Sequence, residues 1–407
     1  MGIDWAEQFH DAVVGRAGVG VTEVRRVAHE PDAVAAFVAY LRGLEPDPCQ
    51  VRVVLETRHG RLVEALLDAG FSMCPVNPDL VARRRGPARK KDDVEDARIC
   101  CLLALDPYGA LKPLVPHSPV AAELRSVARD DERAGRDETR LLNRLRADLQ
   151  IAFPQAVSIA GGDLGGVTVL RMPARWPSRA LLARATRRQL AAFARACRHP
   201  RPDRFVEKII AARAVSAFPV AEHITRAKAD TIRPTGIQLL TLAAQRKAWQ
   251  RRMAELLDGG DAAASMPGGD IYLSFPGLGV RLAARIAGEV GDQVEQFATP
   301  NALSCYAGRA PVTRRSGKSQ FSVVRRLAHN RFLGQAVHQW AFSSLRWSPW
   351  AREFYDAQLA RGKSHHQALR ALGNRWIEVL WHCHRKRVRY DETVHAANRQ
   401  RHQTSAT

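Results

Sequence analysis

The chain has 407 residues, of which 62 are Lys or Arg and 41 are Asp or Glu, so its formal net charge is +21. With 46% hydrophobic residues the chain can form packed domains, and its positive excess predicts a polyanionic partner, usually nucleic acid. We expect a cytoplasmic protein with reduced thiols and no membrane contact, because no apolar run has membrane-spanning length, the start lacks a signal-peptide pattern, and the seven cysteines include no CxxC pair.

The first domain, residues 1–115, is predicted to alternate strands with helices. A mostly apolar run over residues 51–55, typical of a central strand, ends at Glu56, and Asp32 is expected to cap the first helix. The remaining strands are expected to begin at Ile3 and to cover residues 11–14, 21–27 and 71–76, and the helices to cover residues 31–43, 61–69 and 93–105.

A helical connector is predicted over residues 116–260. Apolar stripes in a long charged helix at 119–153 and in a second helix at 237–257 are typical of a coiled coil or a helical hairpin. Between them lies an insertion at about 160–235, rich in Arg and Pro and expected to be mixed but mainly helical.

The last part of the chain is predicted to be a mainly helical domain over residues 261–395. It follows a glycine-containing linker and ends in a flexible tail at residues 396–407. Most of its tryptophans are expected to lie in a core rather than to stack on bases.

Four acidic residues of the first domain are candidate metal ligands. Asp4 lies on the first strand, Glu56 ends the central strand, and Asp93 and Asp96 are three residues apart on one helix, so they share a face. Such carboxylates can converge at one edge of a sheet, where a hard divalent cation, magnesium or manganese, would neutralise them and assist phosphoryl transfer. The alternative is a solvated helix face for the Asp pair and a turn for Asp4.

Two features of the last domain could contact phosphates. Gly277 and Gly279 stand in a Pro-Gly-apolar-Gly turn before a helix, as in a helix-hairpin-helix, although an ordinary tight turn fits these residues equally well. Ser316 precedes a glycine among Arg314, Arg315 and Lys318, where the cations could assist a serine nucleophile. A serine that only hydrogen-bonds phosphate or solvent is the alternative.

Clusters of basic residues could hold a nucleic-acid backbone beside the acidic residues. They are expected to bind phosphates without reading sequence, although each run alone is most often a solvated face. The cluster that lies just before the Asp pair consists of Arg83, Arg84, Arg85, Lys90 and Lys91.

Several motifs resemble those of one protein family. Gly2-Ile3-Asp4, Val54-Leu55-Glu56-Thr57 and the Asp93-Val94-Glu95-Asp96-Ala97-Arg98 run resemble the DEDD motifs of a RuvC-like, RNase H-type domain, although Arg58-His59 departs from the usual small residue and glycine. Residues 275–279, 297–300, 306–308, 316–317 and 329–333 follow the order of the C-terminal domain of the DEDD insertion-sequence transposases, the bridge-RNA-guided recombinases. The resemblance covers the first 105 residues and about 270–390, and the middle matches only as a long-helix connector.

The resemblance implies a fold, a reaction and partners. The fold would be an α/β RNase H-like domain, a coiled-coil connector and a mainly helical C-terminal domain with a helix-hairpin-helix-like motif. Ser316 would attack a DNA phosphate and form a phosphoserine link, with Ser319 and Ser322 as competitors, while Asp4, Glu56, Asp93 and Asp96 would bind magnesium. Donor and target DNA, a structured noncoding guide RNA and a homo-oligomer, a dimer or a tetramer, would be the partners of a nucleoid-associated bacterial enzyme.

Two other classes of function remain open. A metal-dependent DNA junction nuclease would use only the four carboxylates, with water as nucleophile. A non-enzymatic nucleic-acid-binding protein would need neither the carboxylates nor Ser316.

Overall fold

The computed structural model describes residues 1–58, 60–85, 92–107, 111–215, 220–258, 264–316, 320–324, 326–327 and 329–394. Of residues 313–316 and 320–324 only the backbone is described. The predicted tail at 396–407 lies outside these ranges. The chain divides into two compact units, Met1–Pro116 and His117–Thr407.

The first unit is built on a mixed sheet with the strand order β3-β2-β1-β4-β5. Strand β1 pairs antiparallel with β2 and parallel with β4, and β4 pairs parallel with β5. This mixed α/β arrangement is consistent with the RNase H-like fold that the sequence predicts. The strands are β1 (Gly2–Asp4), β2 (Phe9–Arg16), β3 (Gly20–Ala28), β4 (Arg52–Leu55) and β5 (Ser72–Pro75).

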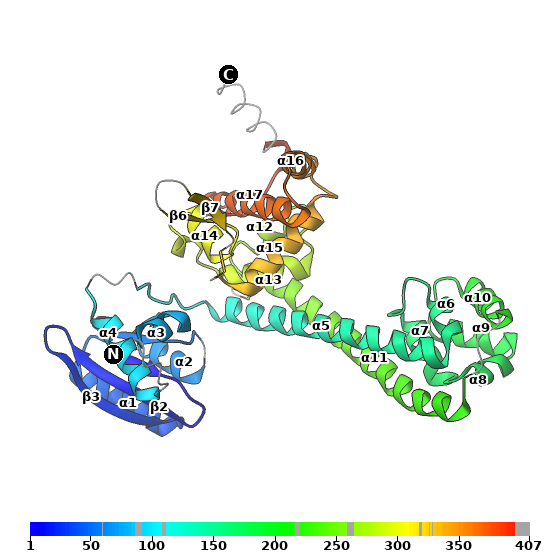
Figure 1. The fold of residues 1–407 in the computed structure, drawn as a ribbon, viewed down its shortest axis with the longest axis horizontal. Coiled ribbons are helices and arrows are strands. Elements are labelled where there is room, and N and C mark those ends of the chain that lie inside the picture. The colour runs from blue at the N-terminus through cyan, green and yellow to red at the C-terminus, as the bar shows by residue number, and fades with distance from the viewer. Residues whose placement is uncertain are drawn as a thin grey trace, which may run out of the picture. The chain divides into compact units, whose positions relative to one another are not determined.

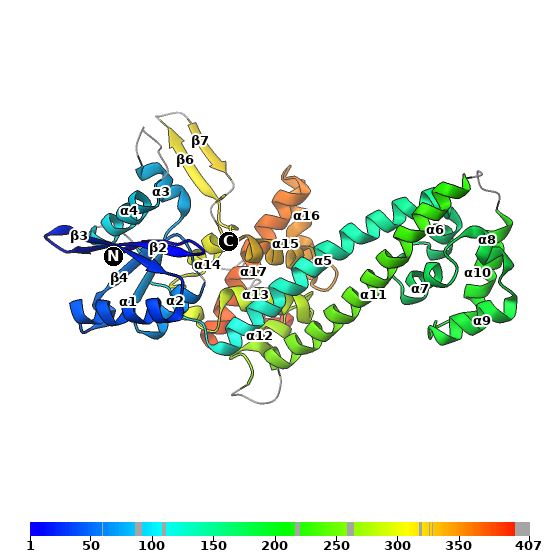
Figure 2. The same ribbon diagram turned by 90° about the horizontal axis from the view of Figure 1, so that it is seen from below.

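Helices cover both faces of this sheet, as Figure 2 shows. Helices α1 (Pro31–Leu44) and α2 (Arg61–Asp68) lie on one face, and α3 (Pro78–Arg84) and α4 (Asp93–Leu105) lie on the other. The expected cap at Asp32 is wrong: Glu30 is the N-cap and Pro31 occupies the first turn. The fixed φ of proline suits that first position, where no backbone N–H is needed.

The close contact between β1 and α4 depends on Gly2. A Cβ atom at Gly2 would lie 2.1 Å from both the Ala97 carbonyl oxygen and the Cys101 backbone nitrogen. Only a residue without a side chain lets the strand approach the helix this closely. Because Asp4 ends β1 and Asp96 lies on α4, this contact fixes the spacing between two of the predicted acidic residues.

The second unit contains two long helices, α5 (Pro119–Ala152) and α11 (Glu222–Asp258), which run side by side (Figures 1 and 2). The predicted helical pair is confirmed, but α11 begins at Glu222 rather than near residue 237. Arg246 of α11 binds Asp131 of α5 across the pair at 2.9 Å. Ion pairs of this kind, together with an apolar seam, hold the two helices together.

The insertion forms a compact set of short helices at the end of the α5–α11 pair that lies away from α12–α17 (Figure 1). Its helical character is confirmed, although the segment after Glu222 belongs to α11. Buried residues such as Phe153, Leu190 and Ile209 form its core together with Leu149 of α5. The helices are α6 (Pro154–Ala160), α7 (Val167–Arg175), α8 (Arg179–Arg184), α9 (Arg187–Ala196) and α10 (Pro202–Ala214).

The C-terminal part of the second unit packs around buried aromatic side chains. Trp340, Trp350 and Trp376 are buried in its core, as predicted, whereas Trp347 is 63% exposed. Among the helices that the structure describes, none is long and apolar enough to cross a membrane. The helices of this part are α12 (Gly269–Leu273), α13 (Val280–Val290), α14 (Pro300–Tyr306), α15 (Arg331–Ser344), α16 (Pro349–Ala360) and α17 (His365–Lys386).

The mainly helical C-terminal domain contains one hairpin that the sequence analysis did not predict. Strands β6 (Val312–Ser316) and β7 (Gln320–Val324) form an antiparallel hairpin between α14 and α15. Both strands contain β-branched or aromatic residues, such as Val312, Phe321 and Val323, which favour a pleated strand over a helix.

Candidate active site

Asp4 and Glu56 lie at the same end of neighbouring parallel strands. Ile3 of β1 pairs with Leu55 of β4, so Asp4 and Glu56 are the next residues on the two strands. Both side chains are half-buried. The predicted convergence of a strand-borne aspartate and a strand-end glutamate therefore follows directly from the register of the sheet.

Asp96 joins this corner from α4, with Arg85 as its partner. Asp96 is 2% exposed, and its two carboxylate oxygens accept hydrogen bonds from Nε and Nη2 of Arg85 at 2.5 and 2.6 Å. The hydrogen-bonded Asp96 carboxylate, followed by the charges of Glu56 and Asp4, raises the pKa of Arg85. One guanidinium thus serves as counter-charge for three of the four predicted acidic residues.

Asp93 occupies a different environment from Asp96. It is the first residue of α4 and is exposed, and Asp92 rather than Asp93 caps the helix by accepting from the backbone N–H groups of Val94 and Glu95. The hydrogen bond that Arg26 donates to Asp11 is the main cause of the raised pKa of Arg26. The charge of Asp93 contributes less to the same rise.

Asp11 was not predicted from the sequence. It is 6% exposed on β2 and lies directly opposite Asp4 in the sheet, with both its oxygens bound by Arg26 at 2.9 and 3.1 Å. A second acid–arginine pair therefore stands beside the Arg85–Asp96 pair. The signal in the sequence was an acidic residue at the start of the apolar run Ala12-Val13-Val14.

The donor set at this corner suits a hard divalent cation in its chemistry. Carboxylate oxygens are the ligands that magnesium prefers, and the carboxylates of Asp96, Glu56 and Asp4 all act electrostatically on Arg85. Within the described residues, however, no three His, Cys, Asp or Glu side chains form a preformed metal cage. Arg85 supplies the positive charge in this structure, so a metal ion would have to share or replace the Asp96 contact.

Cys100 lies one helical turn after Asp96 and is buried beneath the acidic residues. Burial, together with the charges of Glu56, Asp4 and Asp96, raises the pKa of its thiol to about 12. A thiol with this pKa stays protonated at neutral pH and is a poor ligand or nucleophile. Cys100 therefore forms an apolar floor rather than a part of the chemistry.

The basic residues before the Asp pair do not share one environment. Arg83 and Arg84, at the end of α3, are exposed, which leaves them available to phosphates. Arg85 is drawn inward by Asp96. Lys90 and Lys91 lie outside the described residues.

The turn before α13 is tightly packed at Gly277 and open at Gly279. Gly277 has φ +78°, and a Cβ atom there would lie 2.7 Å from the backbone nitrogen of Ser344 on α15. Gly277 is therefore needed for packing against α15. At Gly279, the N-cap of α13, a Cβ atom would meet nothing within 4 Å, so its surroundings leave room for a ligand.

Ser316 is the last residue of β6 and pairs with Gln320 of β7. It therefore stands at the closed end of a β-hairpin rather than in an irregular loop. Arg314 and Arg315 precede it on the same strand, and of these residues the backbone alone is described. Lys318 lies outside the described residues.

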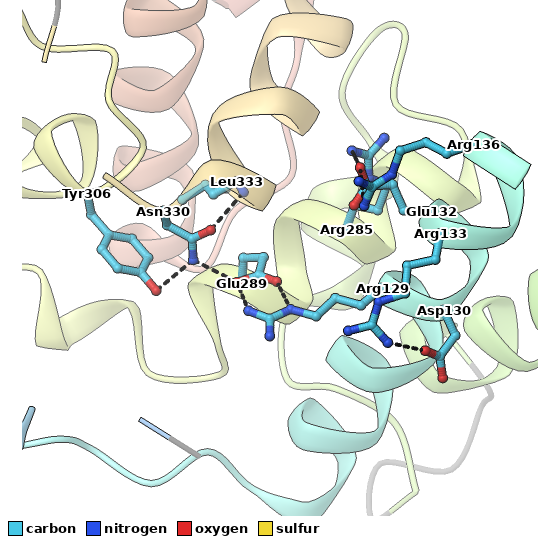
Figure 3. Close-up of polar contacts among 10 residues, drawn as sticks. All are labelled: Arg129, Asp130, Glu132, Arg133, Arg136, Arg285, Glu289, Tyr306, Asn330 and Leu333. Carbon is cyan, nitrogen blue, oxygen red and sulfur yellow. Dashed lines mark hydrogen bonds and ion pairs between the residues drawn. The ribbon is translucent and has the colours of Figure 1, made fainter. Parts of the chain in front are cut away.

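A buried polar network holds the base of this hairpin (Figure 3). The Nδ2 amide of Asn330 donates to the Tyr306 hydroxyl at 2.8 Å and to Oε2 of Glu289 at 2.7 Å. Glu289 in turn accepts two hydrogen bonds from Arg129 of α5, at 2.6 and 2.9 Å. Because Tyr306 ends α14 and Asn330 caps α15, the network fixes both points where the chain enters and leaves the hairpin segment.

Tyr306 and Asn330 lie within the motif ranges 306–308 and 329–333 named from the sequence. Glu289 and Arg129 were not predicted. Glu289 is 4% exposed on an otherwise apolar helix face of α13. An acidic residue on the apolar face of Val280–Val290 was the signal that could have found it.

Comparisons with known proteins agree with the two ends of the chain. Residues 1–154 match a DEDD-type family model described as "Transposase", and residues 270–356 match the model "Transposase IS116/IS110/IS902 family". The chain is 33% identical over 406 residues to the "Mini-circle putative transposase for IS117" of Streptomyces coelicolor, covering 96% of this chain and 95% of the relative. It is also 31% identical to an IS110 insertion-element protein of Streptomyces coelicolor, over 81% of this chain and 80% of the relative, and 26% identical to an IS116 insertion-element protein of Streptomyces clavuligerus, over 94% and 93%.

Proposed function

The chain belongs to the IS116/IS110/IS902 family of transposases, and on this premise we propose that it cuts and rejoins insertion-sequence DNA through a phosphoserine intermediate at Ser316. DNA transposition is the function of the family. The chemical route is our proposal, and its main support is that the sheet register aligns Asp4 with Glu56 while both of these charges and the bound Asp96 act on the Arg85 guanidinium in the first unit.

The carboxylate corner is proposed to hold magnesium or manganese through oxygens of Asp4, Glu56 and Asp96, with Asp93 at its rim. Such an ion, when bound, neutralises charge on a transferring phosphoryl group. Arg85 then becomes available to contact a phosphate oxygen. This proposal is supported by the sheet register that aligns Asp4 with Glu56, and by the burial of Asp96.

Ser316 is proposed as the nucleophile. Its Oγ would form a bond to phosphorus while the bond from phosphorus to the leaving DNA oxygen breaks. The hydroxyl proton leaves with the attack, and the leaving oxygen takes up a proton. Rejoining reverses these bond changes with a hydroxyl of the second DNA strand. The family resemblance selects Ser316, and its place at the closed end of a hairpin anchored by Asn330 is compatible with presenting a hydroxyl to DNA.

A structured guide RNA and assembly into a dimer or a tetramer complete the proposal. Both come from the resemblance of the motifs in the two terminal regions. The positive net charge of the chain supports contact with DNA and RNA alike.

A metal-dependent junction nuclease is the second candidate. It is favoured by the carboxylate corner, which uses residues of the first unit and has no need of Ser316. The two candidates differ in whether protein and DNA become covalently linked.

The decisive experiment searches for that covalent link. Purified protein is incubated with magnesium, labelled DNA that carries the element's ends, and RNA transcribed from the element's flank, and is then run on a denaturing gel. We expect an adduct with the wild type, none with Ser316→Ala, and an adduct with the matched variant Ser322→Ala.

Three further reactions sharpen the outcome. Asp4→Asn should abolish the adduct, whereas Glu95→Gln, a change of an exposed acidic residue on α4, should retain it. Omission of the RNA should also abolish it. An adduct formed by Ser316→Ala contradicts the serine mechanism, and cleavage without any adduct in the wild type supports the nuclease instead.

A further inference from the structure

The positive charge of the chain is unevenly distributed. Residues 153–215, which contain α6–α10 and are called the distal module below, carry twelve Lys and Arg but only three Asp and Glu. The first unit, by contrast, carries fifteen Lys and Arg and seventeen Asp and Glu, and α5 carries seven of each. The distal module is therefore strongly basic, while the unit with the carboxylate corner is slightly acidic.

Nearly all cations of the distal module face solvent. Arg213 is the exception, because it is half-buried and donates to the carbonyl of Leu182. Among the described cations of the distal module, Arg187 is the one that forms an ion pair, with the carboxylate of Glu207. The exposed cations are Arg171, Arg175, Arg179, Arg184, Arg187, Arg188, Arg195, Arg198, Arg201, Arg204 and Lys208.

The spacing of these cations is unfavourable unless an anion is present. Arg171 and Arg175 are four residues apart on α7, and Arg204 and Lys208 are four apart on α10, so like charges lie side by side on each helix. Like charges at this spacing destabilise a helix.

The α5–α11 pair shows the opposite pattern. There Arg252 binds Glu123, and Arg140 binds Asp137. Several cations of the long helices thus pair with acidic residues within the protein, whereas the described residues of the distal module contain one such ion pair, Arg187 with Glu207.

The aromatic residues of the module indicate which form of nucleic acid fits. Trp176 and Phe205 are buried, and Phe193 is half-buried against Trp176. The module therefore lacks the exposed aromatic platform on which single-stranded bases stack. Exposed arginines without such a platform are suited to the phosphates of a duplex.

We propose that the distal module is a second DNA-binding site, which holds the phosphate backbone of duplex DNA without reading its sequence. The module lies at the end of the α5–α11 pair away from α12–α17 (Figure 1). The DNA phosphates that it would contact are therefore different from any that α12–α17 would contact. The inference rests on the family's DNA transposition function and on the charges named above. It is independent of Ser316 and of the carboxylate corner.

The test measures how DNA binding depends on salt. One full-length variant changes four exposed arginines of the distal module that have no carboxylate partner in the described structure: Arg184→Gln, Arg188→Gln, Arg195→Gln and Arg204→Gln. The matched control removes the same charge from four exposed arginines that pair with acidic residues on the long helices: Arg133→Gln, Arg140→Gln, Arg226→Gln and Arg252→Gln.

Affinity for a labelled DNA duplex of arbitrary sequence is measured by fluorescence anisotropy at several salt concentrations. Each lost phosphate contact reduces the slope of log affinity against log salt by about 0.9, so the module variant, which loses four charges, should lose up to about 3.6 units of slope. Its affinity at moderate salt should fall at least about tenfold, with an unchanged melting temperature. The control should keep the wild-type slope.

Two outcomes overturn the proposal. Equal loss in both variants would mean that net charge, and not the module, governs binding. An unchanged slope on duplex DNA, combined with a reduced slope on a hairpin RNA, would assign the module to RNA instead. Ser316→Ala is expected to keep the wild-type slope, which separates this test from that of the serine mechanism.

Discussion

The guanidinium of Arg85 binds both carboxylate oxygens of Asp96, at 2.5 and 2.6 Å, within a corner that also holds Asp4 and Glu56. The contact is a fork-to-fork pair, the geometry in which arginine and carboxylate bind most specifically. It identifies Arg85 as the internal counter-charge of the proposed metal site, a position that the sequence assigned to DNA binding alone.

Removal of Arg85 should make the first unit depend on divalent metal. Arg85→Met leaves the buried Asp96 carboxylate without its counter-charge, so the melting temperature in EDTA should fall by several degrees. Added manganese should restore much of this loss, because it replaces the guanidinium as the positive charge. The measurement is thermal unfolding of the variant with EDTA and with manganese.

The control for this prediction is Arg84→Met, which changes the exposed neighbour of Arg85 and should melt like the wild type in both buffers. A fall in Arg85→Met that manganese does not reverse would argue against a metal site at Asp96.

Gly2→Ala should separate β1 from α4. The new Cβ atom would lie 2.1 Å from backbone atoms of Ala97 and Cys101, which cannot move without displacing the helix. Overpacking of this kind costs about 1–3 kcal/mol or more in the free energy of unfolding. Displacement of Asp4 should also weaken manganese binding, measured by electron paramagnetic resonance.

Gly43→Ala is the matched control, because a Cβ atom at Gly43 meets nothing within 4 Å and the residue lies in α1. That change should leave the protein as stable as the wild type or more stable by up to about 1 kcal/mol. Equal behaviour of the two variants would remove the argument that Gly2 sets the strand–helix contact.

Glu289→Ala should destabilise the second unit strongly. The change leaves the half-buried Arg129 and the amide of Asn330 without their shared acceptor, and breaking a buried ion pair in this way costs about 3–5 kcal/mol. The measurement is urea unfolding followed by tryptophan fluorescence, since Trp5 is the one tryptophan outside the second unit.

The ion pair between Glu123 and Arg252 at the surface is the control for the buried pair between Glu289 and Arg129. Glu123 and Arg252 are 44% and 46% exposed, so Glu123→Ala should cost about 1 kcal/mol or less. Similar losses for the two variants would show that burial of the Glu289 network contributes little.

The second unit should lose stability as the pH falls from about 6.5 toward 4. Burial against Tyr272 lowers the pKa of His384 to about 4, and Nε2 of His384 has no hydrogen-bond partner among the described residues. The unfolded chain, whose histidines titrate near pH 6.5, therefore binds more protons than the folded chain within this window. Above about pH 7 both forms are neutral, and stability no longer changes through this group.

Melting temperatures of the wild type and of His384→Gln at about pH 7.5 and 5 test this prediction. The fall between the two pH values should be smaller in the variant than in the wild type, whereas the exposed neighbour His382→Gln should fall like the wild type. Burial also lowers the pKa of His338 to about 4. Because His338 is unchanged in both variants, it continues to cause part of the loss of melting temperature at low pH. An unchanged fall in His384→Gln would contradict the assignment.

The order and type of most elements followed from local pattern. The alternation and apolar runs of the first unit predicted β2, β4 and α4 within a few residues, because side-chain periodicity follows directly from strand and helix geometry. The pattern failed at the β6–β7 hairpin, where short strands lie between helices, and at the start of α11, whose apolar positions depend on contacts with the insertion.

From the sequence alone followed the resemblance to the family, the prediction of Asp4, Glu56, Asp93 and Asp96 as one acidic set, and the excess of positive charge, since motif order and composition need no coordinates. The tertiary structure was needed to establish which cation faces these acidic residues, that Glu289 and Arg129 anchor the base of the Ser316 hairpin, and that nearly all arginines of the distal module are exposed. The physical reason is that electrostatic partnership depends on distance in space. Arg85 and Arg84 are equivalent in a sequence, and the end of α3 turns one toward a buried carboxylate and the other toward solvent.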